Sequence, residues 1–412
     1  MQTHLSSEFI GAADAKEASA LLNRCVHCGF CNATCPTYQV LGDELDGPRG
    51  RIYLIKQVLE GGDVTRSTQQ HLDRCLTCLN CESTCPSGVE YGRLLEIGRQ
   101  LVDARVDRQP ADKIARWLLK EGLTSAWFGR LWRLGQTLRP ILPKRFRNKV
   151  PARAIALALP KSFQADAPKV LLLQGCVQPS MLPNIDDAAV RVLDAAGIGV
   201  IRVGGTGCCG ALRTHLGDHD GGLHDMRRNI DAWDPMLAKF NIFAIVSSAS
   251  ACALAIKNYG HALVHDSEYA EKAARVSVLA CDLSELLPRM QAALKPRIRL
   301  KSIRRVAFHP PCTLQHGQRL HGGVEAALRG LGLQVDVARS DSHLCCGSAG
   351  AYSILQPQIA LELRDRKLQQ LSLLEPQYIL SANVGCIHHL QSGTATPVKH
   401  WIEWLDEALV AN

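Results

Sequence analysis

The sequence has no long apolar segment. Its longest apolar runs, such as residues 170–173, are far shorter than the roughly 20 residues that a helix needs to cross a bilayer, so they predict buried strands. The first residues also lack the basic stretch followed by an apolar stretch that marks a secretory leader. Both absences predict a cytoplasmic protein without a membrane-spanning helix.

Positive charge is spread unevenly along the chain, although the formal net charge is +8. Residues 105–153 contain 13 Lys and Arg against 3 Asp and Glu, a local charge of +10, so the remainder of the chain carries −2. A nucleic-acid-binding domain usually carries a broad basic surface. The distribution therefore predicts no nucleic-acid partner.

Cysteine is abundant, and eight of the 17 cysteines form two identical runs. In each run a proline follows the last cysteine. The runs are Cys25, Cys28, Cys31 and Cys35 with Pro36, and, fifty residues later, Cys75, Cys78, Cys81 and Cys85 with Pro86. This is the spacing of bacterial two-cluster ferredoxins, whose thiolates bind 4Fe–4S clusters. Because these thiolates must stay free to bind iron, the spacing also indicates a reducing compartment.

The ferredoxin spacing predicts that the two runs exchange their last cysteine, because the fourth thiolate of each run reaches the other cluster. One 4Fe–4S cluster is then expected on Cys25, Cys28, Cys31 and Cys85, and a second on Cys75, Cys78, Cys81 and Cys35. A pair of zinc sites is the alternative. Zinc usually takes two separated Cys-x-x-Cys pairs, which two four-cysteine runs ending in Cys-Pro fit less well.

The insert between the two runs contains Arg49 and Arg51, followed by a helical pattern over residues 52–59. We expect both arginines to be solvated at the surface, which is the usual state of this residue type. The alternative is that their charge tunes the potential of a cluster.

A basic connector is expected over residues 105–167. Residues 127–134 combine aromatic and aliphatic side chains with Arg130 and Arg133 on one short helix. This combination is typical of a helix at a membrane interface, which would place the protein peripherally on the inner membrane. The favoured alternative is a connector packed on a neighbouring domain or a partner subunit, because amphipathic faces usually bury in protein. Neutralising Arg145 and Arg147 would distinguish the two.

From residue 168 onward the pattern becomes α/β and occurs twice. Apolar strands are expected at residues 169–174, 198–203 and 242–247, and again at 305–309, 333–338 and 378–381. Parallel α/β sheets place ligands at the carboxyl ends of their strands, and cysteines follow these strands in both halves. The first set is Cys176, Cys208, Cys209 and Cys252, and the second is Cys312, Cys345, Cys346 and Cys386.

The predicted fold class is therefore α+β, with a mainly helical two-cluster ferredoxin domain followed by a duplicated α/β domain. The expected boundaries are residues 1–104 for the ferredoxin domain, 105–167 for the connector, and 168–300 and 301–412 for the two repeats. Aligning the closing segments of the repeats places Cys281 opposite Trp401, so Cys281 is expected to be a buried structural thiol.

The adjacent cysteines of each repeat precede a glycine, which suits a metal cluster because glycine lets the backbone approach closely. We therefore interpret the two sets as a further cluster or another redox site; a dithiol or a packing role is the alternative. Residues 205–210 formally match a dinucleotide-binding Gly-x-Gly-x-x-Gly, but two of them are cysteines, the pair has a duplicated partner at Cys345 and Cys346, and no well-placed acid follows about 20 residues on. Histidines near the second set are candidate ligands or proton carriers, although hydrogen-bonded histidines are more common: His309, His343, His388 and His389.

The duplicated Cys-Cys-Gly pattern resembles the cysteine-rich domain of heterodisulfide reductase and of iron–sulfur subunits of flavin dehydrogenases. The full motif of that family has a fifth cysteine per repeat. Here Ala249 stands three residues before Cys252, and Asn383 three before Cys386. The five-thiolate clusters of heterodisulfide reductase are therefore not expected.

The whole layout resembles the iron–sulfur subunits of bacterial glycolate oxidases (glycolate dehydrogenases). The resemblance is carried by residues 25–31, 41–51, 71–78, 341–350 and 400–403. The same architecture is similar to that of subunits of L-lactate utilisation and of anaerobic glycerol-3-phosphate dehydrogenase.

The resemblance implies a division of labour between subunits. A flavin-containing partner subunit, which holds the FAD, would oxidise glycolate to glyoxylate and could also accept D-lactate. This chain would carry two 4Fe–4S clusters and no catalytic residue, and would relay electrons toward a membrane acceptor such as quinone. A self-contained cysteine-cluster reductase and a purely structural metal protein are the alternatives. The missing fifth cysteine weighs against the first, and the two complete ferredoxin runs weigh against the second.

Overall fold

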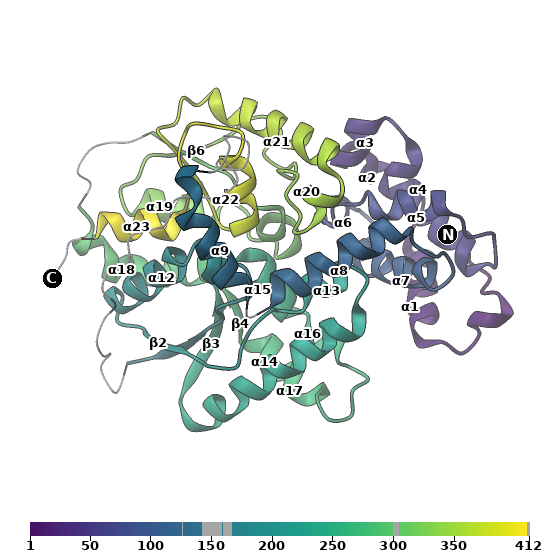
Figure 1. The fold of residues 1–412 in the computed structure, drawn as a ribbon, viewed down its shortest axis with the longest axis horizontal. Coiled ribbons are helices and arrows are strands. Elements are labelled where there is room, and N and C mark those ends of the chain that lie inside the picture. The colour runs from purple at the N-terminus through teal and green to yellow at the C-terminus, as the bar shows by residue number, and fades with distance from the viewer. Residues whose placement is uncertain (126, 142–158, 160–166, 300–304, 410–412) are drawn as a thin grey trace. The chain divides into compact units, whose positions relative to one another are not determined.

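The computed structural model describes all residues except 126, 142–158, 160–166, 300–304 and 410–412 (Figure 1). The chain forms two compact units. The first comprises Met1–Ala115, Cys312–Leu320 and Ser340–Gln369, and the second Arg116–Pro311, His321–Arg339 and Gln370–Asn412. The basic residues Arg145 and Arg147 lie outside the described residues.

The first unit is mainly helical, as the cysteine runs predicted for a ferredoxin-type domain. Figure 1 shows its N-terminal helices in purple and blue. They are α1 (Ala13–Arg24), α2 (Phe30–Ala33), α3 (Pro36–Leu41), α4 (Pro48–Leu59), α5 (Arg66–Asp73), α6 (Asn80–Thr84) and α7 (Tyr91–Asp103), with short 3-10 turns η1 (Ser7–Phe9) and η2 (Glu44–Asp46). Pro36 and Pro48 each occupy the first turn of a helix, where the missing N–H costs nothing.

The core of the first unit packs α1, α4 and α7 together. Leu22, Ile55, Leu59 and Leu94 are fully buried there. A Cβ on Gly50 would lie 2.1 Å from the carbonyl oxygen of Glu44, so α4 rests directly on η2. The second glycine of the Gly-Pro-Arg-Gly-Arg segment, Gly50, is therefore required by packing.

Later segments of the chain complete the first unit. They include the π-helix η5 (Thr313–Gly317) and α20 (Tyr352–Leu355), with α21 (Pro357–Ser372) contributing most of its length. Ser83 Oγ lies 2.9 Å from His316 Nδ1, and the Tyr352 hydroxyl donates to the Arg74 carbonyl oxygen at 2.9 Å. The ferredoxin helices thus hydrogen-bond to segments that lie more than 200 residues away in sequence.

The second unit contains two four-stranded parallel sheets with the same topology. The first has the order β2-β1-β3-β4 and the second β6-β5-β7-β8. Their strands are β1 (Lys169–Leu172), β2 (Gly199–Arg202), β3 (Ile242–Ser247) and β4 (Ala280–Asp282), then β5 (Val306–Phe308), β6 (Val335–Val337), β7 (Tyr378–Ser381) and β8 (Val398–His400). The predicted α+β class with a duplicated α/β part is confirmed.

Helices connect these strands. They are α11 (Gln178–Met181), α12 (Asn184–Ala195), α13 (Ala211–His215), α14 (His219–Lys239), α15 (Ser250–Lys257), α16 (Tyr259–Ala262), α17 (Ala270–Leu279), α18 (Leu283–Leu294), α19 (Gly323–Gly330), α22 (Val384–Gln391) and α23 (Trp401–Ala408), with a 3-10 turn η4 (Lys295–Arg297). The connector forms α8 (Pro110–Thr124), α9 (Phe128–Thr137) and the 3-10 turn η3 (Arg139–Ile141). None of the helices in the described part of the chain combines the length and apolar character needed to cross a bilayer.

The ends of the two repeats correspond closely. Asp282 caps α18 in a capping box with Glu285, and His400 caps α23 in the same way with Glu403. Asp282 therefore corresponds to His400, which places Cys281 opposite Lys399. The expected alignment with Trp401 is wrong. Cys281 is also only partly buried, whereas the sequence predicted a buried thiol.

His400 joins the two repeats within the second unit. Its Nε2 donates to the carbonyl oxygen of Ser248 at 2.8 Å, and its Nδ1 accepts from the Ile402 N–H at 3.1 Å. The ring is fully buried, and burial lowers the pKa of His400 from 6.5 to about 3. The folded protein therefore holds this histidine neutral.

We predict that His400 makes the protein less stable as the pH falls below 6.5. Below pH 6.5 His400 is protonated in the unfolded chain, whereas in the folded protein it stays neutral down to about pH 3. Because of this one proton, the free energy of unfolding should fall by up to about 1.4 kcal/mol for each pH unit below 6.5. His400→Asn keeps an N-cap residue and should flatten the slope, measured by urea unfolding at pH 7 and pH 5.5. Equal slopes in both proteins would contradict the buried neutral ring.

Candidate metal centres

The four cysteines predicted for the first cluster line one cavity in the first unit. Cys25, Cys28, Cys31 and Cys85 meet there, together with Cys81. Cys28 is exposed, and the other three members of the set are partly buried. This cavity therefore opens to solvent on the side of Cys28.

The four cysteines predicted for the second cluster line another cavity of the same unit. These are Cys35, Cys75, Cys78 and Cys81, and all four are buried. Cys81 lines both cavities, so the two are adjacent. A group in the second cavity would be better shielded from water than one in the first, which is one of the factors that set cluster potentials.

The two loops that carry these cysteines have the same unusual backbone. His27 and Gly29 flank Cys28 with φ of 57° and 83°, and Thr77 and Leu79 flank Cys78 with φ of 51° and 60°. Three of the four are not glycine, so the left-handed conformation costs about 1 kcal/mol or more at each. Strain repeated at matching positions indicates loops shaped to turn several thiols toward one group.

Three of these thiols, Cys31, Cys78 and Cys81, resist ionisation without a metal. Burial, followed by the charge of neighbouring Cys25, raises the pKa of Cys31 to about 11. Burial likewise raises the pKa of Cys78 and of Cys81 well above the usual range. Metal cations would remove the repulsion between several thiolates, since binding them releases the thiol protons. The donor chemistry and the two cavities fit iron–sulfur clusters.

Arg51 differs from its predicted surface position. Its side chain is fully buried, and it donates to the His71 carbonyl oxygen at 2.7 Å and to Thr37 Oγ1 at 3.1 Å. It also pairs with buried Asp46, whose other partners include Arg74 at 2.8 Å. Arg51 lines the second cavity, where its charge interacts with Cys75 and Cys35. Arg49 is partly exposed and pairs with Glu44 at 2.6 Å.

In the first repeat, all four cysteines form a chain of contacts. Cys176 hydrogen-bonds to Cys208, Cys208 to Cys209, and Cys209 to Cys252. Hydrogen bonds from Cys176 and Cys209 lower the pKa of Cys208. The set can therefore place four sulfur donors around one metal group at the ends of the first sheet.

Two polar residues that the sequence did not single out hold the loop of the first repeat. Asn229 is fully buried; it donates to the Cys208 carbonyl oxygen at 2.7 Å and accepts from the Gly207 N–H at 2.9 Å. Tyr259 donates to the Cys209 carbonyl oxygen at 3.1 Å. A buried polar residue inside an apolar helical face is the one sequence signal that could have identified Asn229.

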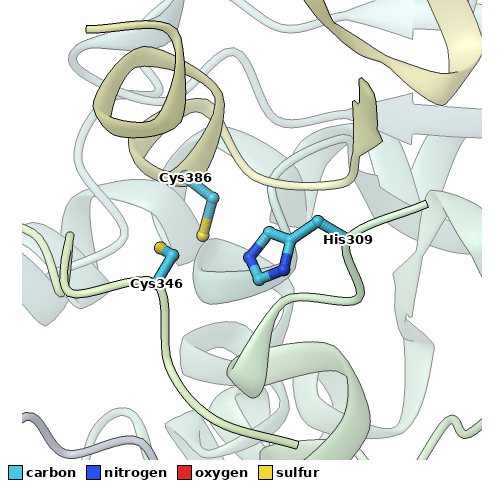
Figure 2. Close-up of side chains that lie close together, drawn as sticks. All are labelled: His309, Cys346 and Cys386. Carbon is cyan, nitrogen blue, oxygen red and sulfur yellow. The ribbon is translucent and has the colours of Figure 1, made fainter. Parts of the chain in front are cut away.

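The cysteines of the second repeat follow strands of the second sheet, but they divide between the two units. In the first unit, Cys312 Sγ lies 3.9 Å from Cys345 Sγ, and Cys345 contacts Cys346. In the second unit, the Cys386 sulfur and a ring nitrogen of His309 lie within 4.8 Å of each other (Figure 2). His309 is thus a second candidate ligand type in this repeat.

The other candidate histidines have different surroundings. His388 lies on α22 with its ring 6.4 Å from that of Trp132, and His389 is buried on the same helix. His343 lies in the first unit, and burial lowers its pKa. Of these four histidines, His309 is the one with a ring nitrogen within 4.8 Å of a cysteine sulfur in a potential metal-binding group.

Each Cys-Cys-Gly loop packs against a helix backbone through its glycine. A Cβ on Gly210 would lie 2.7 Å from the Gly222 carbonyl oxygen, and one on Gly347 would lie 2.4 Å from the Ala360 carbonyl oxygen. Both glycines have φ near 90°. The glycine of the motif is therefore needed both for its conformation and for this close approach.

We predict that Gly347→Ala destabilises the protein by about 1–3 kcal/mol through overpacking, in addition to backbone strain. Gly350→Ala is the matched control. Gly350 also has a positive φ, 62°, but nothing lies within 4 Å of its Cβ position. The control should lose only about 1 kcal/mol, from strain alone. Thermal unfolding of both variants provides the measurement, and equal losses would contradict the packing role.

Comparison with known proteins agrees with this geometry. The 4Fe-4S dicluster domain matches residues 21–89, and the cysteine-rich domain matches twice, at residues 170–257 and 306–391. The chain is 50% identical to the glycolate oxidase iron-sulfur subunit of Escherichia coli (strain K12) over 99% of both chains. It belongs to the family of glycolate oxidase iron–sulfur subunits.

More distant relatives carry related names. The probable glycolate oxidase iron-sulfur subunit of Bacillus subtilis (strain 168) is 28% identical, over 94% of this chain and 92% of the relative. Lactate utilization protein A of Geobacillus thermodenitrificans (strain NG80-2) is 26% identical, over 54% of this chain and 90% of the relative. The family resemblance seen in the cysteine spacing is thus confirmed, and the family's members bind iron–sulfur groups as their names state.

Proposed function

We propose that this chain is the electron-transfer iron–sulfur subunit of a flavin-dependent glycolate dehydrogenase complex. The observation that carries the proposal is the pair of adjacent cavities, each lined by the four cysteines of one expected cluster. The name of the Escherichia coli relative supports glycolate as the substrate of the complex. FAD and the oxidation of glycolate to glyoxylate belong to partner subunits, and D-lactate is a second substrate to test.

Each ligand set that we propose consists of four cysteines that line one cavity. Cys25, Cys28, Cys31 and Cys85 would hold one 4Fe–4S cluster, and Cys75, Cys78, Cys81 and Cys35 the other. When bound, such clusters supply one-electron transfer, which suits a partner flavin that receives two electrons and two protons from each glycolate.

The residues around the two cavities would perform different tasks. Cys28 is exposed, so the first cavity offers the partner flavin subunit the shorter approach. The cysteines of the second cavity are all buried, and Arg51 lies buried beside them as a permanent positive charge. Because Cys81 lines both cavities, electrons would cross only a short distance between the two sites. The chain would then pass them toward a membrane acceptor such as quinone.

The substrate is tested by mixing the anaerobically co-purified complex with candidate substrates. We expect glycolate to bleach the visible absorbance of the iron–sulfur groups, while L-lactate and glycerol 3-phosphate leave it unchanged. Bleaching by one of the other two substrates alone would keep the relay and replace the substrate. Clusters that respond only to disulfides would favour the cysteine-cluster reductase.

We also propose that α9 attaches the protein peripherally to an anionic membrane surface. One side of α9 packs within the second unit, where Gly129 lies against Ser180 of α11. The other side exposes large apolar side chains beside Arg130 and Arg133, namely Trp127, Leu131, Leu134, Leu138 and Ile141. An apolar face next to cationic side chains matches the chemistry of an anionic lipid interface.

We predict that Leu131→Gln with Leu134→Gln abolishes co-sedimentation with vesicles that contain anionic lipid. Both leucines are more than half exposed, so the fold should tolerate the change. The matched control is the exposed Leu373→Gln, on another segment, which should sediment as the parent does. Unchanged sedimentation of the double variant would contradict membrane attachment. Loss of the flavin subunit instead would assign the face to that partner.

A further inference from the structure

A buried lysine lies beside the cysteines of the second repeat. Lys367, on the part of α21 that belongs to the first unit, is only 2% exposed. Its Nζ donates to the carbonyl oxygens of Asp341 and Ser342, the latter at 3.3 Å, in the loop that leads to Cys345. A lysine is almost never fully buried unless its charge is compensated.

The neighbours of the Lys367 ammonium are cysteines and one carboxylate. Burial lowers the pKa of Lys367 to about 8, while the neighbouring Cys346, Cys345 and Asp341 act in the opposite direction. Asp341 is already paired with Arg366 at 2.7 Å. The pKa values of the Cys345 and Cys312 thiols are raised well above the usual range, so these cysteines would become negative only when they bind a metal group. Once bound, their sulfurs would be the negative groups that remain for the ammonium of Lys367 to stabilise.

In the first repeat, the position that corresponds to Lys367 carries no positive charge. The contacts of Gly210 with Gly222 and of Gly347 with Ala360 align α14 with α21. In this alignment, neutral Asn229 takes the place of Lys367. The first repeat instead carries buried Asp225, which hydrogen-bonds to Cys208 and pairs with Arg228 at 2.9 Å and Arg213 at 3.4 Å.

The site of the second repeat also contacts the second ferredoxin set. Cys345 packs in one apolar cluster with Cys78, Leu76 and Tyr352, all within the first unit. The charge of Cys312 acts on Cys78 together with burial. Charges in such a water-poor environment interact more strongly than they do at the surface.

We propose that Lys367 is a positioning residue that makes the cysteine group of the second repeat, next to the second ferredoxin cluster, an electron acceptor. The inference rests on the proposed relay function. Free thiols cannot accept an electron, so the step requires an iron–sulfur group that Cys312, Cys345 and Cys346 would hold. One electron would pass from the iron–sulfur group at Cys78 to that group, which would gain one negative charge while the group at Cys78 would lose one. The fixed ammonium of Lys367 would stabilise that charge without a proton transfer. The first repeat lacks this ammonium, because neutral Asn229 stands at the corresponding position.

The test is a redox titration of the full chain, followed by electron paramagnetic resonance and iron analysis. Cys345→Ser first identifies the signal that belongs to the second repeat. Lys367→Met should shift the midpoint potential of that signal downward, because the compensating charge is lost. Lys367→Arg should restore it. Arg366→Gln is the matched control, because it removes a positive charge one residue away that is already paired, and it should shift the signal far less.

Each result has a distinct meaning. A signal that is lost in Cys345→Ser but unmoved by Lys367→Met, or moved equally by Arg366→Gln, would overturn the role of Lys367 and leave the relay function standing. If Cys345→Ser loses neither iron nor signal, the second repeat holds no redox group, and this inference fails while the relay through the ferredoxin sets remains. If the parent chain gives no iron–sulfur signal at all, the proposed function itself fails.

Discussion

Cys85→Ser should abolish the same cluster as Cys25→Ser, although 60 positions separate the two residues. Cys85 shares a cavity with Cys25, Cys28 and Cys31, whereas its sequence neighbours Cys75 and Cys78 line the other cavity. The expected result is the loss of about four of the eight irons that the two ferredoxin-type sets would hold, since each cluster is a four-iron cube. Iron analysis and electron paramagnetic resonance provide the measurement.

Paired variants make this test sharper. Cys25→Ser with Cys85→Ser should lose no more iron than either single variant, because both thiols serve one cluster. Cys35→Ser with Cys85→Ser should lose all of the iron of the two ferredoxin-type sets, although both residues are last in their runs. Residues that act on one group are non-additive, and residues on independent groups add. The opposite pattern would show that each run holds its own cluster.

Arg51→Met should both destabilise the protein and lower the potential of the second cluster. Removing one partner from a buried charged pair typically costs about 3–5 kcal/mol, because the other charge remains buried. Asp46 would retain Arg74, at 2.8 Å, and His71, at 3.0 Å, so we expect the lower end of that range. The Thr37 hydroxyl and the His71 carbonyl would each lose a donor.

Arg49→Met is the matched control for Arg51. Arg49 stands two positions earlier, but about a third of its side chain is exposed and its ion pair with Glu44 is open to water. Exposed pairs contribute about 0–1 kcal/mol. The control should therefore change neither the stability nor the potential of the second cluster by much. If both variants behave alike, burial of Arg51 has no functional role.

Cysteine spacing predicted the ferredoxin sets because the chemistry of a cluster fixes the positions of its ligands along the chain. Three strands of each sheet were predictable for a similar reason, since a cysteine follows each of them in both halves. The fourth strands, β4 and β8, lack this signal and were not predicted. The burial of Arg51 was not predictable, because the neighbouring Arg49 has the same local pattern and is about one-third exposed. The partners of Arg51 come from three different segments that only the fold brings together.

Long-range packing also explains the other differences between the predictions from sequence and the structure. Cys312 and Cys345 belong to the second repeat by sequence, yet they lie in the same compact unit as the ferredoxin helices. Cys281 aligned with Trp401 by sequence pattern, whereas the capping boxes shift the alignment by two positions. In the sequence, Lys367 looks like an ordinary charged residue on a helix. Its burial could not be predicted, because the buried face of α21 depends on the segments packed against that helix.

The most direct test of the electron-relay account is rapid-freeze electron paramagnetic resonance of the co-purified complex after mixing with glycolate. The account predicts that the signals of both ferredoxin-type clusters appear after the flavin is reduced, and that Cys85→Ser removes one of them. Reduction of the flavin with clusters that stay oxidised would contradict it, because electrons from glycolate would then not enter this chain.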